Sequence, residues 1–202
     1  MVLQQTLQLR AVNDRLLQGA ELRWRRTFST FEVSDIDGSF TRWAPVAVQV
    51  AEADHLQFGQ LGNSYLQVLN LPGVAPPLLN RARFLVSLHV TTVAAMKRAV
   101  GRGDAPTLAL ALARSLSFGA VARYLLDAQR SVIMGSAIAS RDVPGWRRIG
   151  SGGCDFCSML ISRGAVYSRE TVSFASHDRC RCLAEPALDD SLPQILPDPS
   201  PV

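Results

Sequence analysis

Residues 154–157 read Cys-Asp-Phe-Cys, and residues 177–182 read His-Asp-Arg-Cys-Arg-Cys. These two short runs hold all four cysteines of the 202-residue chain and one of its three histidines. The C-x-x-C spacing brings two sulfur atoms close enough to bind one cation, and a second cluster further along the chain can complete a tetrahedral set of ligands. The pattern therefore predicts a zinc site in the C-terminal part of the protein.

Five side chains compete for the four places of such a site. They are Cys154, Cys157, His177, Cys180 and Cys182. We expect the first two cysteines and Cys180 to bind, with either His177 or Cys182 as the fourth ligand, because both members of a C-x-C pair reach one metal only if the chain twists between them. Four protein ligands close a zinc site, so the zinc is predicted to be structural and not catalytic.

Two disulfides, or four free thiols, are the alternative to zinc. The N-terminus lacks the charged and apolar regions of a signal peptide, and we therefore expect the chain to fold in a reducing cytosol. Clustered cysteines there more often bind a metal or carry chemistry than form disulfides. Disulfides formed after release from a cell are the competing prediction.

The residues before this segment predict a helical body. Apolar residues recur at steps of three and four within residues 3–31, 42–69, 78–100 and 108–139, as one face of an α-helix requires. The positions predicted to face the core are Leu9, Val12, Leu16, Ala20, Trp24, Phe28 and Phe31, then Val46, Val50, Leu61, Tyr65 and Val68, then Leu85, Leu88, Thr92, Ala95 and Ala99.

Glycine, proline and small polar residues separate these helices. Residues 34–39 read as a loop, Leu71-Pro72-Gly73 ends the second helix, and the glycines of residues 101–103 end the third. Asp104 is predicted to cap the last helix, with Pro106 in its first turn. Gly119 and Gly135 are expected to mark close packing or a kink.

Composition divides the chain into three parts. Residues 1–144 form the helical body, 145–186 a Cys/His knuckle with β-prone pieces at 146–149 and 165–167, and 187–202 a flexible tail rich in Pro and Asp. The predicted fold class is mainly α, with a zinc-ribbon-like β-knuckle near the C-terminus.

The charge pattern points to no single partner. The net charge is +4, and the arginines are scattered over the chain, which favours an ordinary solvated surface over a nucleic-acid stripe. The most apolar stretch, 108–126, is interrupted by Arg114 and Arg123, so we do not expect it to span a membrane.

Catalytic motifs are not recognisable. The sequence has no H-E-x-x-H of zinc proteases, no H-x-E before P-C-x-x-C of zinc deaminases, and no G-x-S-x-G elbow. His55 and His89 lie on helical stretches and are more simply explained as packing or surface residues. We therefore expect a protein that is not an enzyme, with an enzyme whose site is not visible in the sequence as an alternative.

The C-terminal motif resembles the MuF-like minor head proteins of bacteriophages, in the versions that actinobacteriophages encode. The resemblance rests on Gly145-Trp146-Arg147-Arg148, on Cys154 through Leu160, on Arg163-Gly164 and Tyr167, on His177 through Cys182, and on Pro186. It implies a head-morphogenesis protein that is made in the host cytoplasm and lies inside the virion head near the portal. Some members of that family are fused to a capsid-maturation protease or a toxin, which makes a protease-type enzyme a further alternative, although no such domain is recognisable in this sequence. Its implied partners are the portal protein and the major capsid or scaffold protein, with packaged DNA as a further candidate.

Five side chains around the motif are candidates for contact with a partner or with nucleic acid. They are Trp146, Arg147, Arg148, Arg179 and Arg181. Arginine suits phosphate and carboxylate groups, which it can bind through two parallel hydrogen bonds. The alternatives are a tryptophan packed on the helices, with arginines in water or beside the thiolates. A nucleic-acid-binding zinc knuckle is accordingly the second functional hypothesis.

Overall fold

The computed structural model describes residues 2–140, 143, 145–150, 155–163, 167–168, 174 and 176–188. Cys154 and the tail from Asp189 lie outside the described residues. The fold is mainly helical, with a cysteine cluster near the C-terminus, as predicted.

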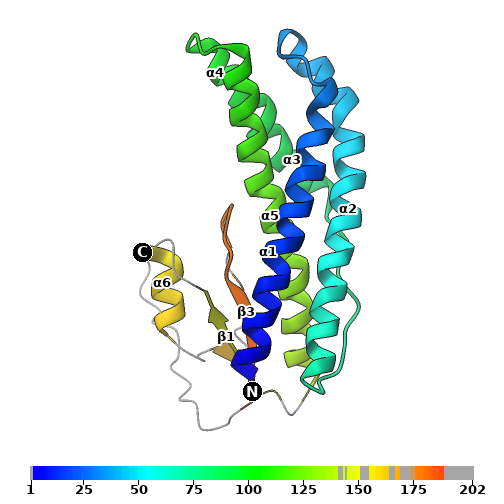
Figure 1. The fold of residues 1–202 in the computed structure, drawn as a ribbon, viewed down its shortest axis with the longest axis vertical. Helices are drawn as coiled ribbons and strands as arrows, with labels where there is room; N and C mark the ends of the chain where they lie inside the picture. The colour runs from blue at the N-terminus through cyan, green and yellow to red at the C-terminus, as the bar shows by residue number, and fades with distance from the viewer. Residues whose placement is uncertain are drawn as a thin grey trace.

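Three long helices run side by side along the long axis of the molecule (Figure 1). They are α1 (Val2–Thr27), α2 (Ile36–Val68) and α5 (Pro106–Ala139). Short 3₁₀ turns, η1 (Phe28–Thr30) and η2 (Val33–Asp35), connect the first two helices. The third predicted helix is divided into α3 (Arg81–His89), a π-helical stretch η3 (Val90–Ala94) and α4 (Ala95–Gly101).

Local sequence accounts for most helix ends, with two exceptions. Residues 34–39 are not a loop, because Asp35 caps α2 by accepting a hydrogen bond from the Gly38 amide at 3.1 Å. Asp104 does not cap α5, whose N-cap is Ala105 without a side-chain hydrogen bond, and instead pairs with Arg102 at 2.7 Å. Gly103, at φ 85°, ends the preceding helix as expected.

The π-helical stretch is a feature that the apolar spacing does not reveal. Thr91 donates its hydroxyl to the Ser87 carbonyl at 2.7 Å, and Thr92 donates to the Leu88 carbonyl. Hydroxyls that bond to the preceding turn compete with the backbone ladder and bend helices. Thr92 is buried, as the sequence predicted.

The core is built from aromatic side chains and many alanines. Trp24, Phe28 and Trp43 pack together, with ring centroids 4.6 Å apart for Phe28 and Trp43 and 5.3 Å apart for the two tryptophans. Four predicted core positions are wrong, because Val12, Val46, Val68 and Leu85 are exposed. The predicted stripes are rotated from the true ones because alanine and glycine face the core on α2 and α5, where they let the helices approach closely.

A small antiparallel sheet and one further helix lie beside the lower half of the bundle, next to the N-terminal end of α1 (Figure 1). The sheet order is β2-β1-β3, from Tyr167–Ser168, Gly145–Ile149 and Leu183–Ala187, and α6 spans Asp155–Ser162. Neither β3 nor α6 was predicted.

Strand β3 lies at the C-terminal end of the predicted knuckle. Glu185, Pro186 and Ala187 are buried, and Pro186 lies opposite Trp146 in the register of β1 and β3. Trp146, Leu183 and Ala184 belong to the same core as the helices. The sheet therefore shares its hydrophobic core with the helical body.

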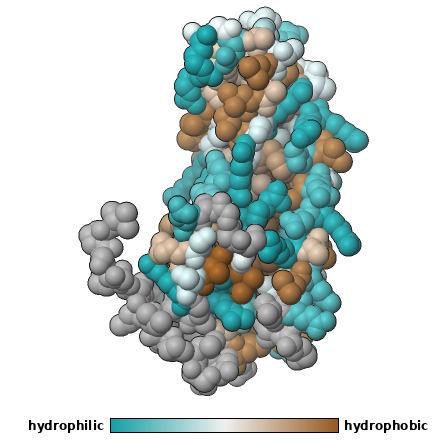
Figure 2. Space-filling model, turned by 60° about the vertical axis from the view of Figure 1, so that its left-hand side comes forward, coloured by the Kyte–Doolittle hydropathy of each residue, from teal (hydrophilic) through white to brown (hydrophobic). Residues whose placement is uncertain are grey.

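Helix α5 is long and apolar enough to cross a membrane by length and composition alone. Half of the residues in its most apolar window are buried inside the bundle. In Figure 2, hydrophilic side chains cover much of the face in view, with an apolar group near the upper end.

Candidate metal centre

Three cysteines meet beside the sheet and form what we call the cysteine cluster. Cys157 lies in the first turn of α6, and Cys180 and Cys182 lie just before β3. All three are buried, and their sulfur atoms lie within 4.8 Å of one another. The Sγ atoms of Cys157 and Cys180 are 3.9 Å apart. Two sulfur ligands of a tetrahedral zinc ion, each bonded at about 2.3 Å, are about 3.8 Å apart, so the spacing fits a metal.

His177 places a ring nitrogen beside one sulfur atom of the cluster. Its Nε2 lies 3.3 Å from the Sγ of Cys157, and its Nδ1 lies 2.8 Å from the carbonyl oxygen of Asp178. A carbonyl that accepts the Nδ1 proton fixes the tautomer and leaves the Nε2 lone pair for a metal, as in many zinc sites. The structure therefore brings three of the five predicted ligands together and places His177 beside one of them, Cys157, while Cys154 lies outside the described residues.

No disulfide joins the three described cysteines to one another. This arrangement fits the metal prediction. Gly150 leaves room for the cluster, because a Cβ at that position would lie 2.9 Å from the Sγ of Cys182.

Two buried arginines supply positive charge to the sulfur atoms. Nη1 of Arg148 lies 3.8 Å from the Sγ of Cys180, and Nη2 of Arg130 lies 3.6 Å from the same atom. The side chains of both arginines are almost fully buried. Metal sites rich in thiolates carry net negative charge, and guanidinium groups at this distance offset it.

The two cysteines of the C-x-C pair differ in acidity. The pKa of Cys180 is lowered, first because Cys182 hydrogen-bonds to its thiolate and also because the Arg130 guanidinium is near. The pKa of Cys182 is raised by the same hydrogen bond and by burial. One thiolate therefore forms readily, and a bound cation would drive ionisation of its neighbour.

Arg130 joins this cluster to the helical body. From the C-terminal third of α5 it donates to the carbonyl oxygen of Cys182 from Nε at 2.9 Å and from Nη2 at 2.6 Å, and to the carbonyl oxygen of Cys180 at 3.0 Å. Its Nη1 pairs with Asp127 at 2.6 Å. A buried guanidinium with this set of acceptors compensates for the loss of its hydration.

Other residues on the same face of α5 hold the segment that leads into the cluster. The face consists of Ser115, Gly119, Arg123, Asp127 and Arg130, which recur at helical spacing. Asp127 accepts the Ser176 hydroxyl at 2.9 Å, and Arg123 pairs with Asp178 at 3.0 Å. The Gly119 carbonyl accepts the backbone amide of Arg179 at 3.2 Å.

The five predicted contact residues fall into two groups. Trp146 and Arg148 are buried. The ring of Trp146 stacks on that of Phe174, with centroids 5.4 Å apart, and the Arg148 guanidinium carbon lies 3.8 Å from the centre of the Phe174 ring. These two side chains therefore do not present a contact surface, which corrects the prediction for them. Packing against the core and the cysteine cluster accounts for both.

The remaining three arginines reach the surface. Arg147 is one-third exposed and pairs with the buried carboxylate of Glu185. Arg179 bonds to the Ser115 hydroxyl at 2.8 Å, and Arg181 lies 3.4 Å from Asp14. Contact between these arginines and a partner stays a prediction.

Sequence reasoning missed the polar face of α5, although a signal was present. Arg123, Asp127 and Arg130 interrupt an otherwise apolar helix at steps of four and three, which places them on one side. Charges on one side of a buried helix predict a polar partner segment there. That partner is the His177–Cys182 run.

Fold and site together define a helical-bundle protein whose C-terminal sheet and helix are tied to the central helix through a thiol-rich candidate metal centre. A family model described as VG15 protein matches residues 89–199. This match covers more than half of the chain, and the protein belongs to the VG15 family, a family of viral proteins. No curated protein and no solved structure gives a significant match.

Proposed function

We propose that this protein is a bacteriophage minor capsid protein that acts in head morphogenesis and is structural, not catalytic. The observation that carries the proposal is the match to a viral protein family over residues 89–199. The matched region includes the whole MuF-like motif of residues 145–186 and all the cysteines. The finer assignment rests on that motif.

The described site supports a structural role. Cys157, Cys180 and Cys182 offer three sulfur atoms, and His177, whose Nε2 lies 3.3 Å from the Sγ of Cys157, is the candidate fourth ligand of a closed zinc site. Zinc bound there would add folding free energy to a C-terminal unit that is otherwise small. The contacts of Arg130 and of the polar face of α5 would connect this stabilised unit to the bundle.

The proposed location is beside the portal inside the head, after assembly in the host cytoplasm. The bundle is elongated, and its helices offer long exposed faces that could bind the portal or the major capsid or scaffold protein (Figure 1). A role in DNA packaging or ejection belongs to the same proposal, because a protein at that place meets the packaged genome.

Composition analysis of purified heads tests the proposal. We expect a few copies per head, in a fixed ratio to the portal subunit, with chemical cross-links between this protein and the portal. A phage with the gene deleted should yield fewer infectious particles, and supplying the wild-type gene should restore them. Absence of the protein from nuclease-treated heads, or full infectivity without the gene, would contradict the assignment.

A further inference from the structure

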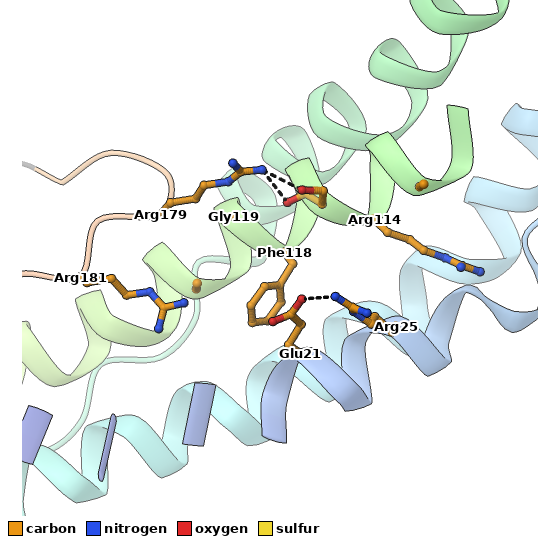
Figure 3. A pocket seen from close by; sticks show the side chains of 10 residues that line it. Glu21, Arg25, Arg114, Phe118, Gly119, Arg179 and Arg181 are labelled. Atoms are coloured by element: carbon orange, nitrogen blue, oxygen red, sulfur yellow. Dashed lines mark hydrogen bonds and ion pairs between the residues drawn. The ribbon is translucent and has the colours of Figure 1, made fainter. Parts of the chain in front are cut away.

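A cavity of about 430 Å³ opens between α1, α5 and the segment that carries Cys180 (Figure 3). We call it the arginine pocket, because four arginines and one glutamate are its charged lining residues. The arginines are Arg25, Arg114, Arg179 and Arg181, and the glutamate is Glu21. This volume lies in the range of cavities that bind small ligands.

The positive charge of the pocket is incompletely paired. Among the described residues, Arg114 has no acidic partner, and its buried Nε has no hydrogen-bond acceptor. Arg179 bonds to Ser115, which is neutral, and Arg181 has one contact of 3.4 Å with Asp14. The Arg25–Glu21 pair, at 2.7 Å, is the single close ion pair in the lining. The pocket therefore retains positive charge to attract an anion.

The backbone at Arg179 is held in an unfavourable conformation. Its φ is 67°, in the left-handed region that favours glycine and costs other residues roughly 1 kcal/mol. The side chain lies across α5 at Gly119, where a Cβ would be 3.0 Å from the Cγ of Arg179. A strained arginine beside a glycine that makes room for it indicates that the guanidinium itself is used.

We propose that the arginine pocket binds phosphate groups of a nucleic-acid strand. Figure 3 shows Arg179 and Arg181 on one side of the pocket and Arg25 and Arg114 on the other, with Phe118 and Glu21 between them, and each guanidinium can donate two parallel hydrogen bonds to a phosphate. The proposal rests on the proposed function in one respect, because packaged DNA is the strand available inside a head.

The lining favours phosphate over an acidic peptide. A peptide ligand needs apolar anchors that enter a pocket, whereas contacts to the nucleic-acid backbone need only donors. Phe118 is the one large apolar side chain in the lining, and it is buried. The remaining surface consists of arginines, alanines, Gly119, Glu21 and the Ser115 hydroxyl.

The cysteine cluster sets the position of two of the four arginines. Arg179 and Arg181 flank Cys180, whose side chain points into the cluster while its neighbours are exposed. The candidate metal centre and the arginine pocket thus lie on opposite sides of the 179–181 segment.

Fluorescence anisotropy of a short labelled DNA duplex with the purified full-length protein tests the proposal. Arg179→Gly removes the guanidinium and also relieves the positive-φ strain, so the melting temperature should stay equal or rise. We expect its affinity to fall about tenfold and the slope of log affinity against log salt to decrease by about one. Gly119→Ala, which keeps every charge but displaces Arg179, should weaken binding severalfold.

Arg26→Ala is the matched control, because Arg26 is an exposed arginine on α1 outside the pocket lining and its loss changes the net charge equally. We expect less than a threefold effect. Equal losses in Arg26→Ala and Arg179→Gly would overturn the site, as would tighter binding of labelled poly-glutamate or of a labelled mononucleotide than of the duplex. The measurement is independent of head composition, so this proposal and the proposed function can fail separately.

Discussion

Arg130, in the C-terminal third of α5, donates a hydrogen bond of 2.6 Å from Nη2 to the carbonyl oxygen of Cys182. This bond connects the buried centre of the bundle with the residue that directly precedes β3. The C-terminal unit is therefore fixed to the body by a polar contact inside the core, in addition to apolar packing by Trp146 and Leu183.

Replacing Arg130 by methionine should destabilise the protein by about 3 kcal/mol or more. The substitution keeps an unbranched side chain but leaves the carbonyl groups of Cys180 and Cys182 without this donor and removes the ion pair with Asp127. Urea unfolding followed by circular dichroism measures the change. Arg83→Met, at an exposed position of α3, is the control and should change stability by less than about 0.5 kcal/mol. Similar losses in both variants would show that the buried bonds are unimportant.

Much of the helical body was predictable from the sequence. The four apolar repeats gave the helical segments, and Pro72, Gly73 and Gly103 lie where the helices end. The buried face of each helix was less predictable. Alanines such as Ala47 and Ala113 fill core positions, whereas the apolar pattern favours larger residues such as Val46, which is exposed. Pattern reasoning finds a helix more reliably than it finds the side that is buried.

The C-terminal unit was predictable in its chemistry but not in its elements. The clustering of Cys157, Cys180 and Cys182 follows from the spacing of the motif. Proline in general disfavours strands, yet Pro186 lies in β3, an edge strand of the sheet, where a missing amide donor is tolerated. Helix α6 has only eight residues, and its acidic first residue, Asp155, was the available signal for a helix start.

Protein purified without a metal-binding tag should contain one zinc per chain. Metal analysis with thiol titration measures this, and a chelator should lower the melting temperature by about 10 °C, because several kcal/mol of binding free energy is coupled to folding. The Cys182→Ser variant should not retain the zinc, and its melting temperature should fall by a similar amount. Ser158→Ala, an exposed change on α6, should leave both quantities as they are. Two disulfides with no zinc would refute the metal centre.

Gly59→Ala should destabilise the protein by about 1–3 kcal/mol, despite the better helix propensity of alanine. A Cβ at residue 59 would lie 2.5 Å from the Cβ of Pro76, a closer approach than real side chains make. Gly19→Ala on α1 is the matched control. Its new methyl group would meet only the end of the flexible Arg23 side chain at 3.4 Å, so it should stabilise by up to about 1 kcal/mol. Thermal melts distinguish the two, and a stabilising Gly59→Ala would mean that the Pro76 segment is free to move.

His55 should make the protein less stable in mild acid. Burial lowers the pKa of this histidine, an effect that the nearby carbonyl oxygens of Pro77 and Tyr124, each 3.1 Å from a ring nitrogen, only partly oppose. The unfolded chain therefore binds a proton at His55 at a higher pH than the folded chain does. This contribution to the free energy of unfolding is fully present above about pH 6.5, the pKa of histidine in the unfolded chain. It is lost as the pH falls through the lower pKa of His55 in the folded chain.

Urea unfolding between about pH 7.5 and about pH 5.5 measures this loss in the wild type and in His55→Asn. The variant should lose less unfolding free energy over the interval, because it has no ring to protonate at residue 55. The other titratable groups are present in both proteins, so the difference between the two curves isolates His55. Parallel curves would show that the His55 ring takes up its proton equally well in the folded and unfolded chains, contrary to the lowered pKa.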